Sequence, residues 1–351
     1  MGSEAENGDH IDKFESGFLG DLIRSGDSDY DDARAVWNGM IDKRPDLVAQ
    51  CQDVADVISA VEFARERDLL VAIRGGGHNA AGLGTCDDGI VIDLSPMNWV
   101  DVDPDARRVR GGGGAFGIVT AFEFEAHPIG TEVATVETWH PIEDATAAFD
   151  AWRDFVETAP RTVSGEAIIW GIPEDPHFPE EHHNDPVAII TAVHAGDPEE
   201  GEDLLRPLRE FGEPLFDFSG RTRYLDLQQG FDPFFPAGEH RYYQGSIYLD
   251  SLDDEVIADI LDRAESRPDP RVLYYVWNLG GAITDVPEHA TAFSGREHPY
   301  LLAIDCKWDD PEVDEAVLDW ARSFQRDMDV HSPGESYRNF PGLGEADDLE
   351  P

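Results

Sequence analysis

The chain contains little lysine, few cysteines and no long apolar run. Only three of its 351 residues are lysine (Lys13, Lys43 and Lys307), and 26 Lys plus Arg face 74 Asp plus Glu, for a net charge of −48. A surface of this sign repels phosphate groups, which excludes nucleic acid as a partner. Salt screens the mutual repulsion of so many carboxylates, so the composition predicts a protein adapted to a cytoplasm rich in salt.

The cysteines and apolar segments exclude further classes of protein. The three cysteines, Cys51, Cys86 and Cys306, are far apart and odd in number, which favours reduced thiols over disulfides and gives no cysteine pair for zinc. No apolar run approaches the roughly 18 residues that span a bilayer. The polar start, Met1 to Asp12, has no secretory pattern. We therefore expect a cytoplasmic protein that does not enter a membrane.

In one short stretch of the chain, three histidines lie close to acidic residues. His177, His182 and His183 lie in a proline-rich, acidic stretch of the chain. That composition is typical of a solvated surface loop, so we expect no metal site there.

The sequence predicts an α+β fold with two domains. Residues 1–32 are acidic and glycine-rich, and we expect them to be disordered, with order beginning near Leu47. Residues 33–128 are expected to form the first domain. Its expected elements are strands at 47–50, 69–73, 90–94 and 118–125, a helix from the N-cap Asp53 to Arg67, and a hairpin from 99–103 and 107–110.

Residues 129–328 are expected to form a second domain with an antiparallel sheet, followed by a C-terminal segment at 329–351. Its expected helices are 145–157, 197–211 and one that follows the N-cap Asp310, and its expected strands are 188–194, 243–249, 272–277 and 301–308.

Two glycine-rich segments are candidate phosphate sites. Arg74-Gly75-Gly76-Gly77-His78-Asn79 follows a buried strand, and its glycines allow backbone amides either to approach an anion or simply to form a tight turn. Gly112, Gly114 and Gly117 match G-x-G-x-x-G, but β-branched, strand-like residues follow instead of a helix. A nicotinamide dehydrogenase needs that helix, so this reading is rejected.

The segment from Val71 to Asn79, leading to Ile90–Ser95, resembles the berberine-bridge-enzyme-like FAD-linked oxidases of the vanillyl-alcohol-oxidase superfamily. The resemblance implies a PCMH-type FAD-binding domain. It also implies that Arg74 to Asn79 wrap the FAD pyrophosphate, and that His78 carries the flavin covalently.

Further motifs extend the resemblance to most of the chain. They are Phe116-Gly117-Ile118-Val119-Thr120, Leu279-Gly280-Gly281-Ala282, Asp305-Cys306-Lys307-Trp308 and Tyr337-Arg338-Asn339-Phe340. They imply that Gly117, Ile118 and Asn339 contact the cofactor and that Tyr337 is the catalytic base. Asp305 would polarise Tyr337 or bind substrate hydroxyls. For both Tyr337 and Asp305, a purely structural role is the alternative.

The resemblance implies an oxidase that moves a hydride from an alcohol, sugar or amine carbon to flavin N5, with O2 as acceptor. Two departures leave a second interpretation open. Arg110 runs directly into Gly111-Gly112-Gly113-Gly114 where the family has a long further segment, and the chain ends at Pro351, soon after the Tyr337 motif. An internal deletion or a gene-model error would explain the first. The alternative function is thus a non-catalytic remnant that binds FAD weakly or not at all.

Overall fold

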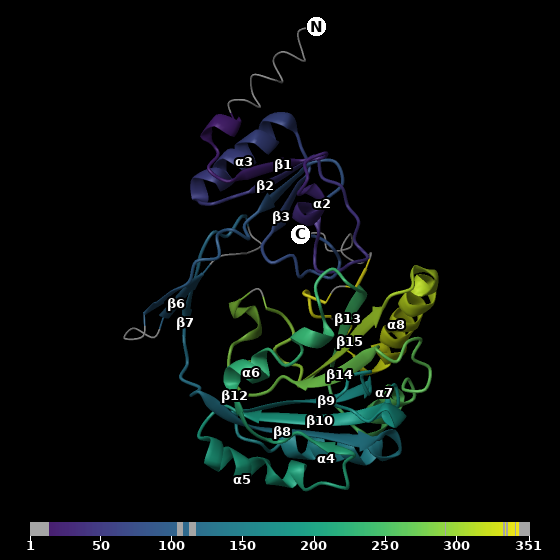
Figure 1. Cartoon of the computed structure of the whole chain (residues 1–351). Coiled ribbons are helices and arrows are strands. Elements are labelled where there is room, and N and C mark those ends of the chain that lie inside the picture. The colour runs from purple at the N-terminus through teal and green to yellow at the C-terminus, as the bar shows by residue number, and fades with distance from the viewer. Residues whose placement is uncertain are drawn as a thin grey trace. The chain divides into compact units, whose positions relative to one another are not determined.

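The computed structural model describes residues 14–103, 108–111, 117–291, 293–332, 334, 336–340 and 342–343. The chain divides into two compact units, which Figure 1 shows together. Unit 1 comprises Met1–Pro128 with Pro236–Glu239, and unit 2 comprises Ile129–Phe235 with His240–Pro351. Each unit combines helices with sheet, which confirms the α+β class. Within the described residues, no helix has the length and apolar character to cross a membrane.

Unit 1 contains two small sheets. Its elements are β1 (Asp21–Arg24), α2 (Tyr30–Arg34), β2 (Leu47–Gln50), α3 (Val54–Arg67), β3 (Val71–Arg74), β4 (Ile90–Asp93), β5 (Asp101–Asp103), β6 (Arg108–Gly111) and β7 (Phe122–Glu125). The first sheet has the order β1-β2-β4-β3, in which only β1 is antiparallel to its neighbour. The second is the antiparallel sheet β5-β6-β7.

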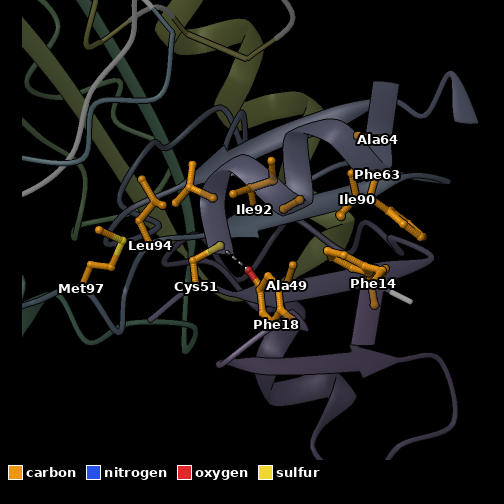
Figure 2. Close-up of a cluster of buried hydrophobic side chains, with 13 residues drawn as sticks. Phe14, Phe18, Ala49, Cys51, Phe63, Ala64, Ile90, Ile92, Leu94 and Met97 are labelled. Atoms are coloured by element: carbon orange, nitrogen blue, oxygen red, sulfur yellow. Dashed lines mark hydrogen bonds between the residues drawn. The ribbon is translucent and has the colours of Figure 1, made fainter. Parts of the chain in front are cut away.

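Helix α3 forms where the sequence predicts it. The Asp53 carboxylate accepts hydrogen bonds from the backbone N–H groups of Ala55 (2.8 Å) and Asp56 (3.0 Å), as expected of an N-cap. The helix ends where Asp68 adopts a left-handed conformation, with φ of 54°. Its buried face contributes to the core shown in Figure 2, whose largest members are Phe14, Phe18, Phe63, Ile90 and Ile92.

The prediction that residues 1–32 are disordered does not hold for the described part, which begins at Phe14. The Phe14 ring stacks on Phe63 of α3 at 4.3 Å between ring centroids, and β1 pairs with β2 along its whole length. Acidic composition argues for disorder only when too little apolar surface is buried. Here the aromatic residues among the acids supply that surface.

A buried carboxylate fixes the chain where it enters β1. Asp56 is 1% exposed, and it accepts hydrogen bonds from the backbone N–H groups of Leu19 (2.8 Å) and Gly20 (3.0 Å). A Cβ at Gly20 would overlap the Gln50 carbonyl oxygen, so only glycine fits beside β2.

Unit 2 is built on one large sheet of eight strands. Its strands are β8 (Glu132–Pro141), β9 (Val163–Gly171), β10 (Pro186–His194), β11 (Phe216–Asp217), β12 (Gly220–Arg223), β13 (Arg241–Leu249), β14 (Leu273–Asn278) and β15 (Tyr300–Trp308). Its helices are α4 (Ala145–Val156), α5 (Pro198–Arg209), α6 (Tyr224–Gln228), α7 (Asp254–Leu261) and α8 (Asp314–Met328). The order is β11-β8-β10-β9-β14-β15-β13, with β12 beside β8, and all pairs are antiparallel as predicted.

Helices cover one face of this sheet. Helices α4, α5 and α8 pack against it (Figure 1), and Tyr274 of β14 contacts Phe324 of α8 edge to face. Successive side chains of a strand point to opposite faces, so Tyr275 lies on the other face. Asp305 of β15 lies on that second face as well, because Ala303, two residues before it, pairs with Tyr275.

The predictions for the remaining strands were right only in part. The strand expected at 118–125 is confined to β7, and β8 and β9 were not predicted. The hairpin is confirmed as β5 and β6, although its turn at 104–107 lies outside the described residues, as do Gly112 to Gly114.

Candidate cofactor and substrate sites

The glycine loop after β3 presents a series of unpaired backbone donors. Among the described residues, none accepts a hydrogen bond from the backbone N–H of Gly75, Gly76, Gly77 or His78. Gly77 has a φ of +69°, which a residue with a side chain rarely adopts. Consecutive amide groups in such a turn form a concave site for an anion.

This loop lines a cavity of about 370 Å³ that is contained within unit 1. His78 is exposed, and its ring stacks near Trp37 at 6.2 Å between centroids and 18° between planes. The other side of the cavity includes Gln50 and Ser95 at the ends of β2 and β4. The loop and the carboxyl ends of these parallel strands therefore face one space, where open α/β sheets commonly bind ligands.

Arg74 lines the same cavity, but its guanidinium is already bound within the protein. Its guanidinium donates to Asp93 at 2.6 Å and to the carbonyl oxygen of Ala35 at 3.1 Å. The Arg74 and Asp93 side chains are only 7% and 0% exposed, and the two residues are register partners on β3 and β4. Ser95 also donates to Asp93 through its backbone N–H and its hydroxyl, at 3.0 Å each. The side chain of Arg74 thus supports the loop by a buried ion pair.

Three other predicted cofactor contacts lie off this cavity. The Asn79 side chain accepts a hydrogen bond from the backbone N–H of Leu83 at 3.1 Å and so closes the next turn. Gly117 is exposed with a φ of +92°, and Ile118 packs against the core of unit 1. None of these three lines the 370 Å³ cavity.

Tyr337 and Asn339 lie together in unit 2. The Asn339 side-chain amide donates to the Tyr337 hydroxyl at 2.6 Å, and the Tyr337 backbone N–H donates to the Ser246 hydroxyl of β13 at 3.0 Å. Tyr337 is half-buried and its ring packs near Phe293 and Phe340.

Asp305 lies on the open face of the sheet, on β15. Burial raises the pKa of its carboxyl to about 6, although Tyr275 and Gln244 hydrogen-bond to it. The Tyr275 hydroxyl donates to Oδ2 at 2.9 Å, whereas Oδ1 is buried without a partner among the described residues. The phenol in contact with Asp305 is therefore Tyr275 and not Tyr337.

Sequence reasoning missed a row of half-buried polar residues on the same face. Glu137, Thr191, Glu166 and Trp277 are neighbours in register across β8, β10, β9 and β14. Burial raises the pKa of Glu166 to about 7, with Asp305 and Glu137 adding repulsion. The sequence signal for Glu166 is an acidic residue within an apolar, strand-like run. It was missed because β9 itself was not predicted.

Two histidines of the acidic segment at 177–183 contact neighbouring aspartates. His177 and His182 contact Asp175 and Asp185, at 2.5 and 3.2 Å respectively. Within the described residues, no group of three or more His, Cys, Asp or Glu side chains is arranged to hold a metal ion.

Comparison with known proteins connects this geometry to flavin chemistry. Residues 45–119 match a family described as an FAD binding domain, and this range includes the glycine loop. Over 95 residues, 27% of this chain, it is 40% identical to (R)-6-hydroxynicotine oxidase of Paenarthrobacter nicotinovorans, and the match spans 21% of that relative. A longer alignment, 21% identical, covers 92% of this chain and 88% of the uncharacterized FAD-linked oxidoreductase YgaK of Bacillus subtilis.

Part of the chain thus matches an FAD-binding domain, and its relatives are named FAD-linked oxidoreductases or oxidases, which supports an oxidoreductase enzyme. Solved structures with its fold include the berberine-bridge-enzyme-like protein 1 of Physcomitrella patens, with a TM-score of 0.80 and 15% identity over 94% of this chain and 90% of that one. The 6-hydroxy-D-nicotine oxidase of Arthrobacter nicotinovorans has a TM-score of 0.75 and 16% identity over 92% and 89%. The chain therefore shares its α+β fold with these solved structures, as its motifs implied.

The residues of unit 1 fit the phosphates of FAD. A pyrophosphate needs several donors that are not already paired, and the glycine loop offers consecutive amides at a cavity. This fit supports the prediction that FAD is the cofactor.

Proposed function

We propose that this oxidoreductase removes a hydride from an alcohol, sugar or amine carbon, and that O2 takes the electrons in the end. FAD, when bound, supplies the hydride acceptor at its N5 atom. The observation that carries the proposal is the run of amides from Gly75 to His78, which have no acceptor among the described residues and lie at a cavity of unit 1. The loop itself lies within the region that matches the FAD-binding family.

The glycine loop would hold the cofactor by its phosphates. The amides of Gly75, Gly76 and Gly77 would donate to phosphate oxygens, while the buried Arg74–Asp93 pair keeps the loop in place. We further assign covalent attachment of the flavin to His78, since its ring is exposed and lines the cavity.

Asp305 and Tyr337 would handle the substrate proton in unit 2. The ordinary pKa of a phenol is about 10, so a tyrosine needs assistance to act as a base near neutral pH. Asn339 gives Tyr337 one hydrogen bond. Asp305, whose pKa is raised to about 6, is ionised at neutral pH and is still more basic than an ordinary carboxylate. We therefore propose that Asp305 accepts the substrate proton first. The hydrogen bond from Tyr275 would orient its carboxylate.

Two observations favour the alternative of a non-catalytic remnant. The YgaK alignment is 416 residues long, yet it spans only 92% of this 351-residue chain, so the relative has residues without a counterpart here. In addition, Phe122 and Phe124 of β7 are 36% and 56% exposed. A missing part of the FAD domain would explain both, and it would weaken cofactor binding.

Anaerobic mixing distinguishes the two functions. The protein is saturated with FAD in high salt and mixed with benzyl alcohol, glucose or benzylamine in separate experiments. Bleaching of the flavin's visible absorbance by one of them, and its return when O2 is admitted, is the expected result. Tight FAD binding without bleaching by any compound of these classes would count against the hydride-transfer proposal, and no FAD binding would favour the remnant.

A further inference from the structure

A second cavity lies wholly within unit 2, where β9 and β15 end. It has a volume of about 490 Å³, and its lining includes Trp170, Phe234, Arg271 and Lys307. Lys307 is one of only three lysines in the chain. No role in the proposed oxidation uses this cavity.

Lys307 is a buried cation with donors to spare. Its side chain is 6% exposed, and Nζ donates to the Phe234 carbonyl oxygen at 2.6 Å and lies 4.9 Å from the centroid of the Phe235 ring. An ammonium group has three N–H donors, so two remain after the bond to Phe234. No carboxylate of the described residues lies within ion-pair distance of it.

The carboxylates nearest to Lys307 are already paired with other cations. Arg271 donates to both oxygens of Asp269, at 3.0 and 2.9 Å, and to one oxygen of Asp309 at 2.6 Å. His240 contacts the other oxygen of Asp309 at 2.6 Å. Among the described residues, this network leaves Lys307 as a buried charge of the cavity without an ion-pair partner.

Two acidic residues of the cavity lining are held by other side chains. Glu174 accepts a hydrogen bond from Asn184 at 2.7 Å, and Asp175 is 2.5 Å from the ring nitrogen of His177. Neither is within ion-pair distance of Lys307.

We propose that this cavity binds a small organic carboxylate whose oxygens accept hydrogen bonds from Lys307. A buried charge is normally paired, and a carboxylate ligand would provide the missing partner through charge-assisted hydrogen bonds. The Trp170 and Phe234 rings would contact the apolar part of the ligand. The indole N–H of Trp170, another residue of the lining, is also buried without an acceptor among the described residues.

Carboxylate binding at this site should depend on pH. Burial, and then the nearby Arg271, lower the pKa of Lys307 to about 8. A carboxylate binds the ammonium form, so the protein must be protonated at Lys307 before it binds. The affinity is nearly full at pH 7, is about half its full value at pH 8, and falls further as the pH rises. From that pKa, binding should be about tenfold weaker at pH 9 than at pH 7.

The wild-type test uses benzoate, with benzamide as its neutral counterpart. Calorimetric titration of the full chain is carried out at fixed KCl, so that competition from chloride is the same at each pH. Benzoate is expected to bind at least about tenfold more tightly than benzamide at pH 7, in line with a hydrogen bond to a charged group. Equal affinities, no benzoate binding, or no loss between pH 7 and pH 9 would overturn the proposal.

Two variants locate the binding. Lys307→Met should lower benzoate affinity by about tenfold or more and remove its pH dependence. Lys43→Met is the matched control, because Lys43 donates to the carbonyl oxygens of Gly82 and Thr85 in unit 1 and should leave binding unchanged. Unchanged binding in Lys307→Met would refute the assignment. The titrations are run with and without FAD, so a failure of the proposed oxidase activity does not affect the result.

Discussion

Replacing Arg74 with methionine tests whether its side chain supports the glycine loop. The substitution removes the guanidinium from a pair whose side chains are 7% and 0% exposed. Among the described residues, the Asp93 carboxylate then keeps donors only from Ser95 and Gln50. Removing one partner of a buried ion pair costs about 3–5 kcal/mol. We therefore expect a loss of that size in the free energy of unfolding of unit 1.

The matched control is Arg44→Met. Arg44 pairs with Asp42 at 3.2 Å, with side-chain exposures of 61% and 64%. An exposed pair contributes less than about 1 kcal/mol, and high salt lowers this further.

Urea unfolding at fixed high KCl, followed by far-ultraviolet circular dichroism, measures both variants. If Arg74→Met loses no more stability than Arg44→Met, the buried pair does not support the loop. A variant of Arg74 that keeps its stability but loses FAD would instead show a direct contact with the cofactor.

Three further predictions concern the loop and the proton-handling residues. Gly77→Ala should lower the stability of unit 1 by about 1 kcal/mol or more, because φ is +69° there, and it should weaken FAD binding in a fluorescence titration. Turnover should rise with pH through about 6 and then level off, because Asp305 accepts a proton only when ionised; Asp305→Asn should lose this limb of the pH–rate profile. Tyr337→Phe should keep its bound flavin while turnover falls by about 10² or less, and a larger fall than in Asp305→Asn would reverse the assignment of the first base.

Local signals in the sequence were sufficient for part of this account. The cap at Asp53 and the apolar spacing of α3 depend on neighbouring residues, and the structure has both. The glycine loop could be predicted as a candidate anion site because its conformational freedom is a property of glycine itself. Covalent attachment through His78 remains a prediction.

Other features depend on partners far away in the chain. The segment at 14–34 looks disordered by composition, but Asp56 bonds to its backbone across 36 and 37 residues. Likewise, the contact between Tyr275 and Asp305 joins different strands, and alternation along one strand cannot say which phenol meets which carboxylate. Tyr337 was predicted as the partner of Asp305 because it lies in a recognisable motif. Tyr275 lies in a strand that has no such motif.

The visible absorption spectrum of the protein purified in high salt, repeated after acid precipitation, tests the central claim most directly. We expect a yellow protein whose colour stays with the pellet. In a His78→Ala variant, the colour should be released to the supernatant. A colourless protein that stays colourless when FAD is added would contradict the assignment of this chain as a working flavin oxidase.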